Sequence, residues 1–198
     1  MATRYFNPKY LVHVGVFSAI YIVVFLTTAA LGIFGPPFLF LGWAIGTVLN
    51  GTVLMLFRLR APCFGAMTLL GLLEGLIAVG SGYPWYVAPL TALLGAGADA
   101  IAQRGGFTNR TLNMIGYGVF APWIALPFLP ILVNSQAYFD MLYAKARNKA
   151  FVAQLEHYLN GTTVILWMGT LVLVGLVGAW LGNRIIAKHF VKAGLVDT

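Results

Sequence analysis

The stretch 137-AYFDMLYAKARNKAFVAQLEHY-158 is a charged segment in an otherwise apolar chain. Only 9% of all residues are charged, yet this stretch holds Asp140, Lys145, Arg147, Lys149, Glu156 and His157. It is rich in Ala, Leu and Lys and contains neither Gly nor Pro, which predicts a helix. Long apolar runs flank it on both sides, so we expect this helix to lie outside the hydrocarbon layer of a membrane.

The composition indicates an all-α, polytopic membrane protein with a single domain over residues 1–198. The chain is 60% hydrophobic and its mean hydropathy is +0.87, whereas a soluble domain would expose more charge than 5 acids and 12 bases supply. The net charge of +7 does not indicate nucleic-acid binding, because the bases lie at the ends of apolar runs. The single cysteine, Cys63, excludes an internal disulfide.

Six apolar runs predict six transmembrane helices. They cover residues 10–34, 38–57, 62–80, 85–102, 111–133 and 162–181, each near the roughly 20 residues that one crossing needs. The first run is too long for the apolar part of a cleavable signal peptide. Gly35, Pro36 and Pro37 predict a break after the first run, residues 81–84 predict a tight turn, and several prolines predict a kink in the fifth run.

The basic residues predict the orientation. Six crossings place both termini on one side, together with Arg4, Lys9, Arg58, Arg60, Arg104, Arg110, Arg184, Lys188 and Lys192. Only Lys145, Arg147 and Lys149 fall on the other side. By the positive-inside rule both termini are cytoplasmic, and residues 137–158 form an external helical loop between the fifth and sixth helices.

Small residues at helical spacing indicate close helix contacts. Gly15, Ser18 and Ala19 form such a stripe on the first helix, and further stripes lie on the second (Gly42, Gly46) and sixth (Gly175, Gly178, Ala179, Gly182). Each stripe either packs within this chain or forms a docking face for another membrane subunit. The stripe on the first helix is the best candidate for docking.

Two acids fall inside the predicted helices, where a carboxylate is costly and is usually paired or functional. Glu74 shares a helical face with Gly71, Gly75 and Ala78 in the outer half of the third helix. It is either a protonated or hydrogen-bonded structural acid or a polar group that lines an outward-facing cavity. Asp99 lies near the cytoplasmic end of the fourth helix, where we expect a structural pairing with a loop donor or a nearby base.

The external ends of the helices are aromatic. Tyr83, Trp85 and Tyr86 cluster at one turn, and Tyr138 and Tyr143 lie in the external helix. They either form an interfacial aromatic belt or stack on a flat ligand. Lys145, Arg147, Lys149 and His157 lie beside them, either as ligand-binding groups or as solvated surface charges.

The sequence lacks three common motifs of nucleotide-binding and hydrolytic enzymes. It has no phosphate-binding G-x-x-x-x-G-K-[ST], H-E-x-x-H or G-x-S-x-G pattern, its histidines do not cluster, and it has no pair of cysteines. We therefore expect no enzymatic activity, no catalytic residues, no metal site and no intrinsic cofactor.

Several segments resemble a known family of transporter subunits. They are PKYLVHVGVFSAIYIVV (8–24), SGYPWYV (81–87), GAGADAIAQRGGF (95–107), IGYGVFAPWIALPFLP (115–130), QAYFDML (136–142) and GAWLGNRIIAKHFVKAGL (178–195). In this order, and over nearly the full length, the chain resembles the substrate-binding S components of energy-coupling factor (ECF) transporters, specifically the MptD-like, or Trep_Strep, group.

The resemblance implies a six-helix protein in the plasma membrane of a prokaryote. Such a subunit captures a vitamin or cofactor-like compound from outside and docks on a transmembrane coupling subunit that carries two cytosolic ATPases. The family docks through A-x-x-x-A on the first helix, and Gly15-x-x-x-Ala19 occupies that place here. The implied pocket lies in the outer halves of the later helices, capped by residues 31–38, 81–86 and 134–160.

The ligand and two other functions stay open at this point. Aromatic residues beside Lys145, Arg147 and Lys149 suit a flat ligand with carboxylates or phosphates, such as haem or a pterin-like compound. His157 is the only external histidine available as an axial ligand to haem. The alternatives to a capture subunit are a membrane scaffold or assembly protein and a small self-sufficient permease, although no inverted repeat supports a permease.

Overall fold

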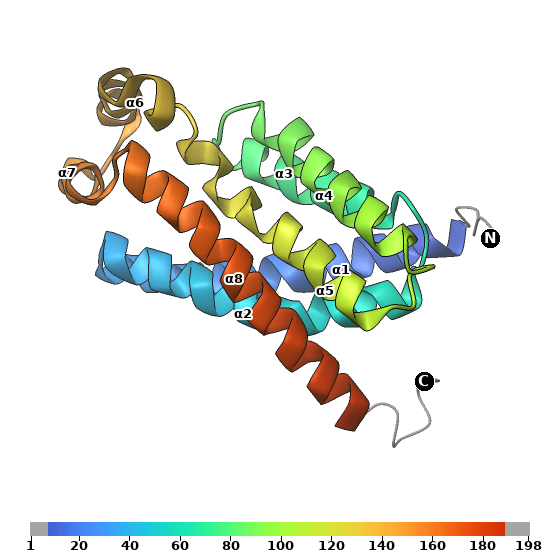
Figure 1. The fold of residues 1–198 in the computed structure, drawn as a ribbon. Helices are drawn as coiled ribbons and strands as arrows, with labels where there is room; N and C mark the ends of the chain where they lie inside the picture. Colours follow the sequence, from blue (N-terminus) through green and yellow to red (C-terminus); the bar gives the residue numbers. More distant parts are fainter. Residues whose placement is uncertain (1–7, 189–198) are drawn as a thin grey trace.

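The computed structural model describes residues 8–188. Arg4 and Lys192, which the sequence analysis assigned to the cytoplasmic side, lie outside the described residues. The described part is helical and contains no strand (Figure 1). Its elements are α1 (Pro8–Ala29), η1 (Ala30–Phe34), α2 (Pro36–Arg60), α3 (Ala66–Gly80), α4 (Val87–Gln103), α5 (Arg110–Phe120), η2 (Ala121–Phe128), α6 (Ile131–Lys145), α7 (Lys149–Tyr158) and α8 (Gly161–Ile186).

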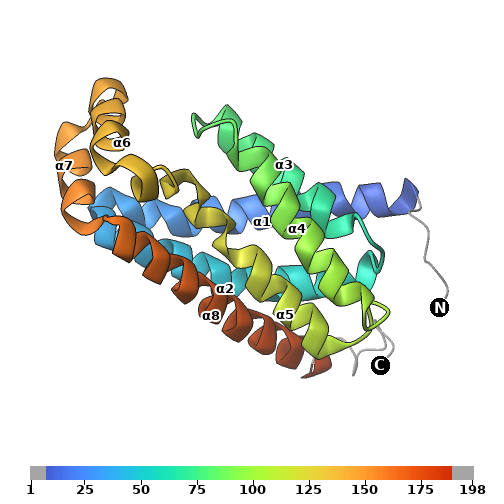
Figure 2. The same cartoon turned by 45° about the horizontal axis from the view of Figure 1, so that its top comes forward.

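The helices α1 to α5 and α8 pack as a closed ring. Around the ring the order is α1, α2, α8, α5, α4 and α3, and α3 returns to contact α1. The connections α2–α3 and α4–α5 lie at one end of this bundle, and the 81–86 turn lies at the other end with α6 and α7 (Figures 1 and 2). We call α6 and α7 together the cap.

The predicted apolar runs are all helical, but they differ in length. Three segments are long and apolar enough to cross a membrane: Pro8–Phe34, Pro36–Arg60 and Gly161–Ile186. Arg110–Phe128 together with Ile131–Lys145 forms a fourth if this pair, bent by 49°, is one span. The helices α3 and α4 have only 15 and 17 residues, or about 22 and 26 Å at 1.5 Å per residue. The structure therefore supports three or four spans by length and composition.

The prolines interrupt the fifth apolar run as the sequence predicts. The α-helix α5 ends at Phe120, and a 3₁₀ helix with Pro122 in its first turn and Pro127 inside it continues the chain. Proline has no backbone N–H to donate and its ring disfavours a continuous α-helix. All eight residues of η2 are buried, and η2 contacts both α4 and α8. It therefore fills the space between these later helices.

The prediction of one helix over residues 137–158 is wrong. The helix α6 ends at Lys145, Ala146 is extended, and α7 begins at Lys149. The side chain of Asn148 accepts a hydrogen bond of 3.0 Å from the backbone N–H of Phe151, so it caps α7. This short polar side chain satisfies an N–H group at the start of a new helix, which favours a restart over helix continuation.

The glycine stripes on the second and last helices pack within the chain. A side chain at Gly51 would collide with the backbone of Gly178, and one at Gly178 would lie 2.8 Å from Val48 Cα. Gly51 and Gly178 therefore bring α2 and α8 into backbone contact, whereas Gly42 and Gly46 of the second-helix stripe lie against Thr28 of α1. The first helix differs, because a Cβ at Gly15 would meet no atom within 4 Å.

Candidate functional site

A cavity of about 340 Å³ lies inside the half of the bundle that carries the 81–86 turn. Its walls come from α1, α2, α3, the 81–86 turn and η2, in residues Ile22, Phe25, Leu26, Ala29, Leu39, Trp43, Glu74, Ile77, Ala78, Ser81, Tyr83, Trp123, Ile124 and Pro127. This volume falls within the range of small-molecule sites, about 300–1,000 Å³. The cavity is a candidate binding site.

The directions in which the helices run show which lining residues lie near the 81–86 turn and which lie far from it. The helices α1 and α3 run toward the 81–86 turn and α2 runs away from it (Figure 1). The lining residues farthest from that turn along their elements are Ile22, Trp43, Glu74 and Trp123. They form the floor, and the mouth is at the opposite end, where Ser81 and Tyr83 are exposed.

Glu74 is the only charged residue among those that line the cavity. Its side chain is 0% exposed, and neither carboxylate oxygen has a hydrogen-bond partner in the part of the chain that the structure describes. The hydroxyl of Ser18 approaches it from α1, but Ser18 Oγ also makes no hydrogen bond. Buried polar groups without partners are rare and costly, so this pair indicates a place where a ligand supplies the missing contacts.

Aromatic rings line the same cavity as this carboxylate. The rings of Phe25 and Trp43 are stacked with centroids 6.3 Å apart, and Phe25 also contacts Trp123 at 5.4 Å. The indole Nε1 of Trp123 donates a 2.8 Å hydrogen bond to the hydroxyl of Tyr21. Since an indole has a single donor, Trp123 offers the cavity only its apolar ring.

The structure separates the predicted aromatic site residues. Tyr83 lines the mouth of the cavity, and burial raises the pKa of its phenol above the usual value. Trp85 is 76% exposed and contacts the ring of Tyr86, whose hydroxyl donates to the carbonyl of Pro127 at 3.4 Å. Tyr138 is buried in α6, close enough to Tyr83 and Tyr86 to interact with them electrostatically.

The remaining candidates in the cap do not line the cavity. Tyr143 donates a 2.7 Å hydrogen bond to Glu156 and so joins α6 to α7. Lys145, Arg147 and Lys149 are exposed around the break between these helices, and His157 is exposed on α7 beside Tyr158. The expected juxtaposition of these bases with Tyr83 around one ligand is therefore absent from the cavity. A second groove of about 220 Å³ near the end of α7 is lined by Tyr158 but by none of the bases.

The position of the cavity also differs from the pocket that the resemblance implies. That pocket belongs to the later helices, whereas these walls come mainly from α1, α2 and α3. The physical reason is η2, whose fully buried residues occupy the space beside α4 and α8. Of the implied capping segments, residues 81–86 contribute Ser81 and Tyr83, and residues 134–160 contribute nothing to the lining.

Sequence reasoning missed Phe25, Trp43 and Trp123 as cavity residues. All three lie in apolar runs, where nothing in the residue pattern distinguishes a cavity wall from a lipid-facing or core position. Ser18 and Tyr21 gave a weak signal, because two polar groups one turn apart in an uncharged helix need partners in the interior.

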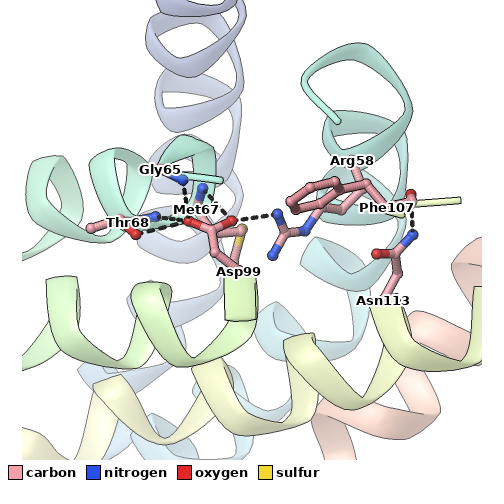
Figure 3. Close-up of polar contacts among 7 residues, drawn as sticks. All are labelled: Arg58, Gly65, Met67, Thr68, Asp99, Phe107 and Asn113. Atoms are coloured by element: carbon pink, nitrogen blue, oxygen red, sulfur yellow. Dashed lines mark hydrogen bonds and ion pairs between the residues drawn. The ribbon is translucent and has the colours of Figure 1, made fainter. Parts of the chain in front are cut away.

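The predicted structural pairing of Asp99 is confirmed. Its carboxylate accepts hydrogen bonds from Arg58 at 2.6 Å, from the backbone N–H groups of Gly65, Met67 and Thr68, and from the Thr68 hydroxyl (Figure 3). The acid on α4 therefore caps the start of α3 and ties it to the end of α2. A carboxylate at a helix N-terminus satisfies free N–H groups and is favoured by the helix dipole.

The residues of the small-residue stripe on α1 lie on two different faces of the helix. Gly15 and Ala19 are exposed on the outside of the bundle, where they are available to another helix. Ser18 is 4% exposed and turned toward Glu74. Assigning Ser18 to the docking face is therefore wrong, because a helix places residues 15 and 19 on one side and residue 18 about 100° away from residue 19.

Within residues 8–188 no group of three or more His, Cys, Asp or Glu side chains is placed to hold a metal ion.

Residues 9–192 match the family described as a hypothetical bacterial integral membrane protein (Trep_Strep), and the chain belongs to this family. No curated protein and no solved structure matches the chain.

Proposed function

We propose that this membrane protein is the substrate-capture subunit of an ECF-type importer in the plasma membrane of a prokaryote. It binds a vitamin or cofactor-like compound from outside and delivers it by docking on a transmembrane coupling subunit that carries two cytosolic ATPases. The chain itself hydrolyses no ATP in this proposal. It rests on the family resemblance of the sequence and on the site described above.

The observation that carries the proposal is the cavity that ends at Glu74. A scaffold protein has no need for a ligand-sized cavity with an unpartnered carboxylate at its floor, whereas a capture subunit does. The walls are apolar and aromatic, with few polar groups, as is usual for sites that bind small organic molecules.

The distribution of bases supports an outward-facing mouth. Lys9, Arg58, Arg60, Arg104, Arg110 and Arg184 all belong to the helix ends and loops opposite the 81–86 turn. By the positive-inside rule that end is cytoplasmic, so the mouth near Tyr83 faces outside. We propose that α3 and α4 also cross the membrane, which gives six crossings and cytoplasmic termini. Their shortness is accommodated by local thinning of the bilayer.

The exposed part of α1 supports docking. Gly15 and Ala19 present a smooth surface, and a Cβ at Gly15 would meet no atom of this chain within 4 Å. Small residues at this spacing let two helices approach closely in lipid. The stripe therefore suits a helix of the coupling subunit.

Co-purification from the native membrane tests the proposal. We expect the full-length chain to bring down a transmembrane subunit and two ATPases, and mass spectrometry to find a bound small molecule. The double variant Gly15→Leu with Ala19→Leu should lose the partner subunits. The matched control is Gly169→Leu, because Gly169 is an exposed glycine on α8 that also has no atom within 4 Å of its Cβ position. Equal loss in the control, or no loss in the double variant, contradicts the docking assignment.

A further inference from the structure

We infer that the cavity binds a compact aromatic or heteroaromatic compound whose buried end carries a protonated amine or several N–H donors directed at Glu74. This inference rests on the proposed function, since it names the chemical class of the captured compound. It replaces the anionic ligand that the sequence analysis favoured.

The charge of the cavity is the first argument. Glu74 is its acid, and no Lys, Arg or His is among the residues that line it. A ligand carboxylate or phosphate would enter an apolar site beside another carboxylate, without a cation to pair with, which is strongly unfavourable. A cation or an N–H donor instead gives Glu74 the partner that the protein does not supply.

The location of Glu74 on its helix explains why the protein leaves it without a partner. It lies in the middle of α3, where the backbone N–H groups are already bonded within the helix. The nearby hydroxyl of Ser18 is also unpartnered. Glu74 lies at the floor of the cavity and Ser18 approaches it from α1, so the polar end of the ligand points inward.

The aromatic walls favour the same class of ligand. The ring of Phe25 packs against both Trp43 and Trp123, and the N–H of Trp123 is already donated to Tyr21. These rings stack on a flat ligand, and their faces attract a cation. At the mouth, the phenol of Tyr83 is the side chain that can meet an acceptor on the other end of the ligand.

The charge and the aromatic walls of the cavity favour a pterin-like compound over haem, the two ligands that the sequence analysis named. A pterin-like compound has an edge with N–H donors and a flat ring system, so both of its features have a counterpart here. Haem carries two carboxylates, and the residues that line the cavity provide no cation for them. The exposed Lys145, Arg147 and Lys149 lie in the cap and outside this lining.

Three matched probes test the ligand class on the wild-type protein. The full chain is purified in lipid nanodiscs, and calorimetry measures its affinity for 1-naphthylmethylamine, 1-naphthalenemethanol and 1-naphthoate, which share one ring system. We expect the amine to bind at least tenfold more tightly than the carboxylate, with the alcohol between them. Equal or tighter binding of 1-naphthoate overturns the inference, and so does the absence of saturable binding by the amine.

A variant of Glu74 tests whether this carboxylate causes the preference for the amine. Glu74→Gln should reduce the affinity for the amine about tenfold and leave the affinity for the alcohol nearly unchanged. The control is Asp140→Asn, which removes an exposed acid from the cap and should change neither affinity. If Glu74→Gln retains the full preference for the amine, the assignment of Glu74 is wrong.

The inferred ligand class and the proposed transport role can fail separately in these experiments. A chain that prefers 1-naphthoate but co-purifies with two ATPases retains the proposed function and loses the inferred ligand class. A chain that prefers the amine but never associates with an ATPase retains the binding site and loses the transporter assignment.

Discussion

Two buried carboxylates of the bundle have opposite surroundings. Asp99 and Glu74 are both 0% exposed, and they lie on neighbouring helices, α4 and α3. Asp99 accepts hydrogen bonds from Arg58, from Thr68 and from the backbone at the start of α3 (Figure 3). Glu74 accepts none from the described residues. One acid therefore completes the fold, and the other is available to complete a ligand site.

The difference follows from where each acid meets the backbone. The first turn of a helix has free N–H groups, and Asp99 lies against the first turn of α3. Glu74 lies in the middle of that same helix, where all N–H groups are used. A buried acid next to a helix start is readily satisfied by the protein, whereas one in mid-helix depends on side chains or on a ligand. The following predictions test this contrast, from the largest expected effect to the smallest.

Replacing Asp99 with alanine should destabilise the protein most. The change leaves the buried Arg58 guanidinium and several N–H groups of α3 without an acceptor, at a cost of about 3–5 kcal/mol. Thermal unfolding in nanodiscs measures the loss, with Asp140→Ala as the exposed control. Stability equal to that of the control would show that the Asp99 cluster is not structural.

Replacing Glu74 with leucine should have the opposite effect on stability. The variant removes an unpartnered buried carboxylate from apolar surroundings and should stabilise the ligand-free protein by about 1–3 kcal/mol. The same variant should lose its preference for 1-naphthylmethylamine over 1-naphthalenemethanol. A clear loss of stability, measured by the same unfolding assay, would show that the protein itself satisfies Glu74.

The backbone at the start of α3 provides a third test. Gly65 has a φ of +94° and donates its N–H to Asp99 at 2.9 Å. Gly65→Ala should cost about 1–2 kcal/mol, because a side chain disfavours this left-handed conformation. Gly80→Ala, at the other end of α3, is the control, since a Cβ there meets no atom within 4 Å. Equal stability of the two variants would contradict the proposed strain.

The smallest expected difference compares one neighbour of each acid. Thr68→Val removes a hydroxyl that donates to Asp99 at 2.8 Å and should cost about 1 kcal/mol. Ser18→Ala removes a hydroxyl near Glu74 that has no hydrogen bond, so its stability should equal that of the wild type within error. Denaturant titrations of both variants measure the pair, and the reverse order would overturn the contrast.

Some elements of the fold were accessible from the sequence. Long apolar runs predicted the helices, and Gly35, the 81–84 turn and the prolines after Phe120 marked their breaks. The pairing of Asp99 was also predicted, because an acid near a helix end in an apolar segment requires a donor. The break at Asn148 was missed, because the surrounding residues favour a helix and a cap is a local choice that composition does not reveal.

The sequence predicted only part of the candidate site. Glu74 and Tyr83 were identified because an acid in an apolar helix and an aromatic at a turn are visible in the sequence. The floor rings Trp43 and Trp123 come from runs that are far apart in the chain, and they line one cavity because both pack against Phe25 of α1. The exclusion of Lys145, Arg147 and Lys149 from the cavity depends on the placement of the cap.

By itself the sequence determined that this chain is a helical membrane protein, since its apolar runs leave the chain no soluble fold. It also predicted that the two acids within its apolar runs, Glu74 and Asp99, need partners. The tertiary structure decided which acid is structural and which one faces a cavity. Hydropathy along a helix measures the cost of burying a carboxylate, whereas only the packing of neighbouring helices determines whether donors lie close enough to offset that cost.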